Sequence, residues 1–175
     1  LIYGTAKDAF EISNEPKEIL EKYGNTSIGK NLLLARRLIE SGTRIVNLHF
    51  GGWDMHGDIE AGFKNLGPKL DKAMAAFISE IYDRNMNEEV MLVVVGEFGR
   101  TKLNSGLVNG IQYKPGRDHW PTQSSLLIAG GKYDMGRTIG TTDKYCYVPK
   151  DGIKGPSDLL ATIFDHFSID LHTQK

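Results

Sequence analysis

The sequence predicts an α/β fold with a layered, mainly parallel sheet and helices on both of its faces. Segments with the three- and four-residue apolar spacing of helices alternate along the chain with apolar segments of strand length. One of these, Val90–Val95, is a continuous apolar run rich in valine, which is typical of a strand buried on both faces of a sheet. The chain has 175 residues, 40% of them hydrophobic, so residues 1–175 are expected to form a single domain around one core.

The first half of the chain predicts three helices and a strand. Lys17–Tyr23 is expected to form a short helix, and Ser27–Ser41 has the apolar spacing of an amphipathic helix. The apolar run Arg44–Phe50 then predicts the first strand. A long helix is expected from about residue 58 to residue 84, with a kink or a break at Gly67-Pro68 because proline cannot donate a helical hydrogen bond.

The second half continues this alternation. After the strand at Val90–Val95, residues 99–116 show no period and predict a long loop, which is usually functional or disordered in a compact domain. Gln123–Ala129 predicts the third strand. Pro156 is placed to open a last helix over Ser157–Phe167, since proline is favoured at the first helical position.

Composition gives no support to several classes of partner or to a disulfide-stabilised fold. The formal net charge of −1 gives no reason to expect nucleic acid or an anionic membrane surface as a general partner. No apolar run approaches the roughly 20 residues that a membrane-spanning helix needs. Cys146 is the single cysteine, so an intrachain disulfide cannot form. The chain begins with Leu1 rather than methionine, and we therefore expect it to be a fragment of a longer protein.

Three short polar clusters lie where the predicted strands begin or end. Side chains at strand ends gather in the crevice where α/β sheets bind ligands. Carboxylates and imidazoles brought together there are suitable ligands for Zn, Mn or Fe. The sequence therefore predicts a metal site at these strand ends. Its candidate ligands are Asp54, His56, Glu97, Asp118 and His119.

Each candidate ligand also has a purely structural explanation. Asp54 would cap the helix that follows it and leave His56 at the surface. Glu97 would form a salt bridge with Arg100, because a carboxylate at the end of a buried strand needs a partner. Asp118 would only orient the neighbouring imidazole. The spacing of the whole set, rather than any single member, favours the metal site.

Two arginines flank these clusters. A guanidinium beside a metal site is a suitable group to bind a phosphate or sulfate oxygen, because its N–H donors match the oxygens of such anions. We therefore expect Arg100 and Arg117 to bind substrate. Arg100 is also the expected catalytic residue, since it would neutralise charge on the group being transferred.

Several motifs carry a resemblance to a known family. In chain order they are Leu34-Ala35-Arg36-Arg37-Leu38, Phe50-Gly51-Gly52-Trp53-Asp54-Met55-His56-Gly57, Gly96-Glu97-Phe98-Gly99-Arg100-Thr101, Gly116-Arg117-Asp118-His119-Trp120-Pro121 and Asp158-Leu159-Leu160-Ala161-Thr162-Ile163. Together they resemble the DUF1501 family of uncharacterised, sulfatase-like bacterial proteins in the alkaline phosphatase-like superfamily. Because family members are longer, the resemblance covers only their C-terminal part. Many carry an export signal, which implies a periplasmic or extracellular location for the parent protein.

The resemblance implies a metal-dependent hydrolase of phosphate or sulfate esters, acting on a small molecule or a glycan. The implied cofactor is a divalent metal: Zn, Mn, Fe, Ca or Mg. By order, Asp54 and His56 resemble the first ligand pair of the superfamily, and His119 resembles its last histidine. Glu97 stands where the middle pair would begin, and Phe98 occupies the place of a ligand histidine. The nucleophile of the superfamily comes from an N-terminal half that this chain does not contain.

The alternative is a non-catalytic member of the superfamily that binds a glycan or a partner protein. Trp53 and Trp120 flank candidate ligands and are able either to stack on a sugar or to pack in a core. Phe98 in place of a ligand histidine favours this alternative, whereas the clustered carboxylates favour the enzyme. The sequence leaves open the metal, the substrate, the oligomeric state and whether residues 99–116 form a lid.

Overall fold

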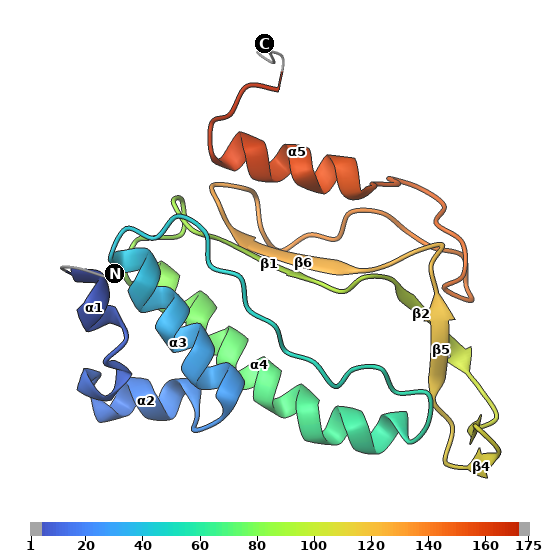
Figure 1. The fold of residues 1–175 in the computed structure, drawn as a ribbon. Helices are drawn as coiled ribbons and strands as arrows, with labels where there is room; N and C mark the ends of the chain where they lie inside the picture. Colours follow the sequence, from blue (N-terminus) through green and yellow to red (C-terminus); the bar gives the residue numbers. More distant parts are fainter. Residues whose placement is uncertain (1–4, 172–175) are drawn as a thin grey trace. The chain divides into compact units, whose positions relative to one another are not determined.

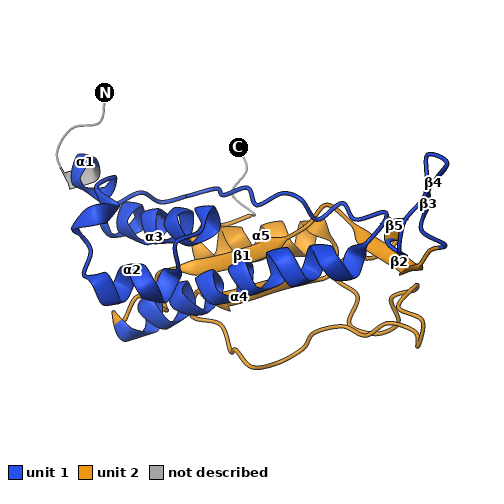
Figure 2. Cartoon of the chain, turned by 90° about the horizontal axis from the view of Figure 1, so that it is seen from below, with its two compact units in different colours: residues 1–83, 105–116 blue, residues 84–104, 117–175 orange. Residues whose placement is uncertain are grey.

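The computed structural model describes residues 5–171 (Figure 1). The chain divides into two compact units, each built from two stretches of sequence (Figure 2). Unit 1 comprises the chain up to Asp83 together with Ser105–Gly116, and unit 2 comprises Arg84–Asn104 together with the chain from Arg117 onward.

Unit 1 is mainly helical. The predicted helices over residues 17–23 and 27–41 are confirmed. The long helix is also confirmed, and its helical assignment continues through Pro68 rather than breaking there. Its helices are α1 (Thr5–Ala9), a 3-10 turn (Ile12–Asn14), α2 (Lys17–Tyr23), α3 (Ser27–Glu40) and α4 (Ile59–Asp83).

Local hydrogen bonds explain where α3 begins and ends. The Thr26 hydroxyl accepts a hydrogen bond from the backbone N–H of Gly29 at 3.2 Å, which satisfies one free donor of the first turn. After the last turn, Gly42 adopts a φ of 96° and its N–H donates to the Ile39 carbonyl, while the N–H of Thr43 donates to the Leu38 carbonyl. This is the Schellman arrangement, which ends a helix at a glycine.

The core of unit 1 holds a buried arginine. Arg36 of α3 is 2% exposed and lies 2.8 Å from a Glu15 carboxylate oxygen and 2.6 Å from Glu40. Arg37, on the next position of the helix, also pairs with Glu15. A buried charge is costly unless it is paired, so this ion cluster ties the segment around Glu15 to α3. Apolar side chains of α2, α3 and α4 surround it; the most buried are Tyr23, Leu33, Ala73, Phe77 and Ile81.

The predicted strand at Arg44–Phe50 is wrong. This segment has no regular secondary structure, and Ile45 is 72% exposed. A strand needs a neighbour that takes its backbone hydrogen bonds, and none of the described strands pairs with these residues. The chain that follows packs on α4 instead, where the Trp53 ring lies 5.4 Å from the Phe63 ring.

The expected loop at residues 99–116 is also corrected, because it contains three short strands. Two of them form a hairpin in unit 1, β3 (Leu107–Val108) with β4 (Ile111–Gln112). The turn between them is Asn109-Gly110, and both residues have positive φ. Asn-Gly is the residue pair that a two-residue hairpin turn of type I′ favours, so the local sequence contained a hairpin signal.

Unit 2 contains two antiparallel strand pairs and a helix. Its elements are β1 (Met91–Val95) paired with β6 (Leu126–Gly130), β2 (Gly99–Leu103) paired with β5 (Arg117–Trp120), and α5 (Pro156–His166). The strand expected at 123–129 is confirmed with shifted ends, as is the last helix. Gly155 donates its N–H to the Asp158 carboxylate at 2.8 Å, which fixes the start of α5.

The prediction of a layered, mainly parallel sheet is therefore wrong. Among the described residues every sheet has two strands and every pair is antiparallel, so the chain has a small mixed α/β fold. The valine-rich run does form β1, but it has β6 as its single strand neighbour and Val95 is 56% exposed. Apolar composition predicts a strand without specifying its partner or direction. No helix of the described chain combines the length and the apolar character needed to cross a membrane.

The buried ion cluster predicts a pH dependence of stability. Burial by itself would raise the pKa of Glu15, but the hydrogen bonds and charges of Arg37 and Arg36 outweigh it and hold this pKa below its usual value of 4.5. Because the folded chain protonates Glu15 less readily than the unfolded chain, its stabilisation is complete above about pH 5 and is lost as pH falls through the lowered folded pKa. We expect Glu15→Gln to reduce the free energy of unfolding by about 2 kcal/mol at neutral pH.

Urea denaturation between pH 3 and pH 7 would test this prediction. The slope of stability against pH below pH 4.5 should be shallower in Glu15→Gln than in the wild type. Glu18→Gln, at an exposed position of α2, is the matched control and should leave the slope unchanged. Equal slopes in the wild type and Glu15→Gln would contradict the assigned role of Glu15.

Candidate metal centre

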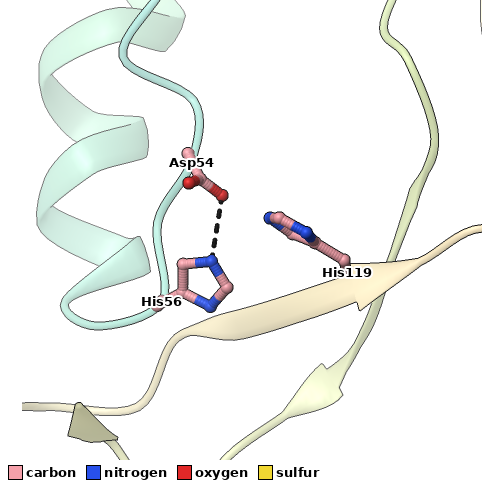
Figure 3. A group of neighbouring side chains, drawn as sticks. All are labelled: Asp54, His56 and His119. Atoms are coloured by element: carbon pink, nitrogen blue, oxygen red, sulfur yellow. Dashed lines mark ion pairs between the residues drawn. The ribbon is translucent and has the colours of Figure 1, made fainter. Parts of the chain in front are cut away.

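Asp54 and His56 form an ion pair in unit 1. Nε2 of His56 lies 3.1 Å from Oδ1 of Asp54, and the two side chains are 33% and 61% exposed respectively (Figure 3). His119, drawn in the same figure, belongs to unit 2 and is described with it below. The pair joins an imidazole to a carboxylate at the surface, where a ligand from solvent can reach both groups.

The residue between them is buried against α4. Met55 is 8% exposed, and a Cβ built on Gly62 of α4 would collide with its sulfur. The N–H of Met55 donates to the Trp53 carbonyl at 2.9 Å, so the chain makes a tight turn at Asp54. The buried Met55 and this turn fix the segment from which the Asp54 and His56 side chains meet.

The backbone after His56 is held by the segment that precedes β5. Gly57 forms an antiparallel bridge with Pro115, and the N–H of Asp58 donates to the Lys114 carbonyl at 2.9 Å. Gly116 approaches so closely that a Cβ on it would collide with the carbonyl group of His56. A glycine is therefore required at 116, and it fixes the position of the His56 backbone within unit 1.

In unit 2 the β2–β5 register sets His119 beside Arg100. The two residues are direct cross-strand partners, so their side chains project from the same face of the strand pair. The centroid of the Phe98 ring lies 4.4 Å from the centroid of the His119 ring. The Arg100 guanidinium carbon lies 5.7 Å from the same Phe98 centroid. The Arg100 guanidinium also lies 3.4 Å from the Arg117 carbonyl, to which it donates. Unit 2 thus brings an imidazole, an aromatic ring and a guanidinium together.

Asp118 faces the other side of β5. It precedes His119 on the strand, and the burial of β5 alternates with His119 exposed and Asp118 half-buried. Its carboxylate accepts a hydrogen bond from the Asn104 side chain at 3.0 Å, and its backbone N–H donates to the Thr101 hydroxyl. This arrangement separates the Asp118 carboxylate from the His119 imidazole. Asn104 was not singled out from the sequence, because an asparagine after a strand carries no signal of this contact.

Glu97 and Arg117 are both exposed. Glu97 lies in the bend between β1 and β2, and the residues just before it are exposed as well, so its charge does not end a buried strand as the sequence suggested. Arg117 begins β5, two positions before His119, and so shares a side of the strand with it. The ligand role of Glu97 and the anion-binding role of Arg117 stay predictions.

Both tryptophans of the clusters have aromatic neighbours. Trp53 lies between the rings of Phe50 and Phe63, at 5.8 Å and 5.4 Å. The Trp120 ring lies 4.7 Å from that of Tyr147, and its indole N–H donates to the Tyr147 carbonyl at 2.8 Å. These contacts give each tryptophan a packing role, and they use ring surface that a sugar would otherwise occupy.

The donor atoms fit a transition-metal ion. Two ligands of a tetrahedral ion, each about 2.0–2.1 Å from the metal, lie about 3.3 Å apart. The Asp54 oxygen and the His56 nitrogen lie 3.1 Å apart, close to that separation. Imidazole and carboxylate together suit Zn, Mn or Fe.

Comparison with known proteins assigns the family. The model of a family described as "Protein of unknown function (DUF1501)" matches residues 3–174, so the chain belongs to the DUF1501 family. No curated protein and no solved structure matches the chain. The membership of the DUF1501 family expected from the motifs is confirmed.

The close approach at Gly116 yields a stability prediction. Gly116→Ala should lower the free energy of unfolding by about 1–3 kcal/mol, because the added methyl group forces the His56 backbone to move. Gly67→Ala is the matched control: nothing lies within 4 Å of its Cβ position, and alanine favours the helix by up to about 1 kcal/mol. Urea denaturation of both variants would measure the difference. A Gly116→Ala variant as stable as Gly67→Ala would contradict the tight contact.

Proposed function

We propose that this chain carries the metal-binding part of a hydrolase that acts on phosphate or sulfate esters. By the order of the motifs, Asp54, His56 and His119 are the proposed metal ligands, and Arg100 would bind the charged oxygens of the ester. The observation that carries the proposal is the cross-strand pairing of Arg100 with His119, since it joins an anion-binding group to a metal-binding group on one strand pair.

The residues have separate roles in the proposed reaction. A divalent cation, when bound, supplies a Lewis acid and lowers the pKa of a coordinated water or hydroxyl nucleophile. The guanidinium of Arg100 would donate hydrogen bonds to the non-bridging oxygens and offset the charge that they carry. Arg117 would supply a second cation toward the same anion. Two imidazoles and one carboxylate favour Zn, Mn or Fe over Ca or Mg.

The sulfatase-like and alkaline phosphatase-like assignments belong to this proposal, as does the periplasmic or extracellular location. They rest on the motif resemblance. Glu97 is retained as a further ligand candidate. Asp118 is better placed to hold the β2–β5 pair through Asn104 than to share an ion with His119.

A binding module for a protein partner is the second candidate, because unit 2 exposes many apolar side chains. Helix α5 has no buried residue. Exposed large apolar residues of its strands and helix include Val95, Leu103, Leu126, Leu127 and Leu160. Exposed apolar surface of this kind is typical of interaction sites. The packed tryptophans give less support to glycan stacking.

Metal content is the first test of the proposal. The purified chain, incubated with Zn²⁺ and desalted, should retain about one equivalent by plasma mass spectrometry, as expected for a site with three protein ligands. Replacing Asp54 or His119 with alanine should weaken Zn²⁺ binding by more than the roughly 10–100-fold that loss of an outer-shell partner costs. His49→Gln, at another exposed histidine of unit 1, is the control and should bind like the wild type. Equal retention in all four proteins would contradict the ligand assignment.

Hydrolysis of aryl phosphate and aryl sulfate by the full-length parent protein tests the reaction, because the nucleophile is expected outside residues 1–175. With metal present, Arg100→Gln should lower kcat/KM by about 10²–10³-fold, the usual cost of removing one donor to a developing negative charge. A chelator should abolish the activity, and added metal should restore it. Absence of hydrolysis with every divalent metal tried, in a parent protein that does retain metal, would favour the binding module.

A further inference from the structure

We propose that Phe98 is a positioning residue that holds the His119 imidazole and the Arg100 guanidinium in one fixed arrangement. This inference rests on the proposed function of the same face and deepens it. Phe98 would set the separation between the metal-binding nitrogen and the anion-binding donors. The substrate class that follows is an ester of a compact tetrahedral oxyanion, whose oxygens must meet both groups at once.

The geometry puts one aromatic ring against both functional groups. The Phe98 ring centroid is 4.4 Å from that of His119, with a tilt of 46° between the ring planes. The same ring has the Arg100 guanidinium carbon 5.7 Å from its centroid. Because Arg100 and His119 are cross-strand partners, the strand register sets the spacing of their backbones, and the Phe98 ring contacts the ends of both side chains.

The position of Phe98 is itself constrained by its neighbour. A Cβ on Gly99 would collide with the Gln123 carbonyl oxygen and lie 3.3 Å from that of Trp120. The backbone at 99 is therefore pressed against the segment that follows β5. Tyr147 also holds this segment, because its carbonyl accepts hydrogen bonds from the Trp120 indole and the Thr122 hydroxyl. The backbone from which the Phe98 ring projects is therefore held in place beside β5.

Phenylalanine is chemically suited to this role. Its ring face attracts a guanidinium by about 0.5–1 kcal/mol at an exposed site, and tilted contact with another ring is also favourable. It offers no donor or acceptor, so it cannot compete for a metal ion or an anion. Arginine loses up to about 2 kcal/mol of side-chain entropy when it is immobilised, and a ring that restrains it beforehand reduces that loss on binding.

Phe98→Leu tests the inference, with Phe98→Tyr as the conservative variant and Phe63→Leu as the matched control. Phe63 is an exposed phenylalanine of unit 1 whose ring also contacts another aromatic ring. NMR of the metal-free chain reads the positioning directly. In Phe98→Leu, the His119 ring protons should lose their ring-current shift and the Arg100 Nε–H should become more mobile. Both signals should be close to wild type in Phe98→Tyr and in Phe63→Leu.

Titration with Zn²⁺ and then with inorganic phosphate supplies the functional readout. Phe98→Leu should weaken the binding of both by about 10-fold, as loss of a residue that orients a ligand does. His119→Ala should mainly weaken Zn²⁺, and Arg100→Gln should weaken phosphate alone. Phe63→Leu should change neither, even where its thermal midpoint falls as far as that of Phe98→Leu.

The two readouts separate this inference from the proposed function. NMR signals of His119 and Arg100 that are the same in Phe98→Leu and in the wild type would overturn the positioning role. Unchanged affinity for both Zn²⁺ and phosphate in Phe98→Leu would overturn it as well. A wild-type chain that binds neither probe would instead overturn the proposed function, while the metal-free NMR comparison would still decide whether Phe98 positions the two side chains.

Discussion

The close approach of Gly116 to the backbone of His56 is the constraint on which the candidate site depends. It fixes the end of the segment that carries Asp54 and His56. Any side chain at 116 would push these two backbones apart. The bridge between Gly57 and Pro115 and the hydrogen bond from Asp58 to Lys114 reinforce the same contact. A glycine with no chemistry of its own therefore holds the backbone next to Asp54 and His56 in place.

The charged groups of unit 1 differ in burial, and burial decides how much each contributes to stability. Arg36 is 2% exposed and sits among carboxylates of the same unit, so its charge contributes to the stability of the helices that it joins. The Asp54 side chain is 61% exposed and pairs with a half-exposed imidazole. Solvent screening makes such a pair weak as a stabilising interaction. The pair therefore contributes little to the stability of unit 1, unlike the buried cluster.

The two faces of the β2–β5 strand pair carry different sets of side chains. One face carries Arg100 and His119 against the Phe98 ring, and the other carries Asp118 against Asn104. Strand alternation alone produces this division. The side that holds the Arg100 guanidinium and the exposed His119 imidazole is suited to an anionic ligand, and the side of Asp118 is suited to holding the strands together. The proposed hydrolase and the positioning role of Phe98 both follow from the first face.

The sequence alone determined the helices and the membership of the DUF1501 family, while the tertiary structure decided the sheet and much of the site. Helical hydrogen bonds join residues four apart, so apolar spacing and terminal residues such as Thr26 and Gly42 predict them locally. Strand hydrogen bonds join distant segments, and composition cannot name the partner: Val90–Val95 was recognisable as a strand, but its antiparallel pairing with β6 was not. The candidate ligands were found as residue types after strand-like runs. The register of β2 and β5 puts Asp118 and His119 on opposite faces of the strand pair and Arg100 directly across from the imidazole. The sequence does not specify this register, because it depends on which strand pairs with which.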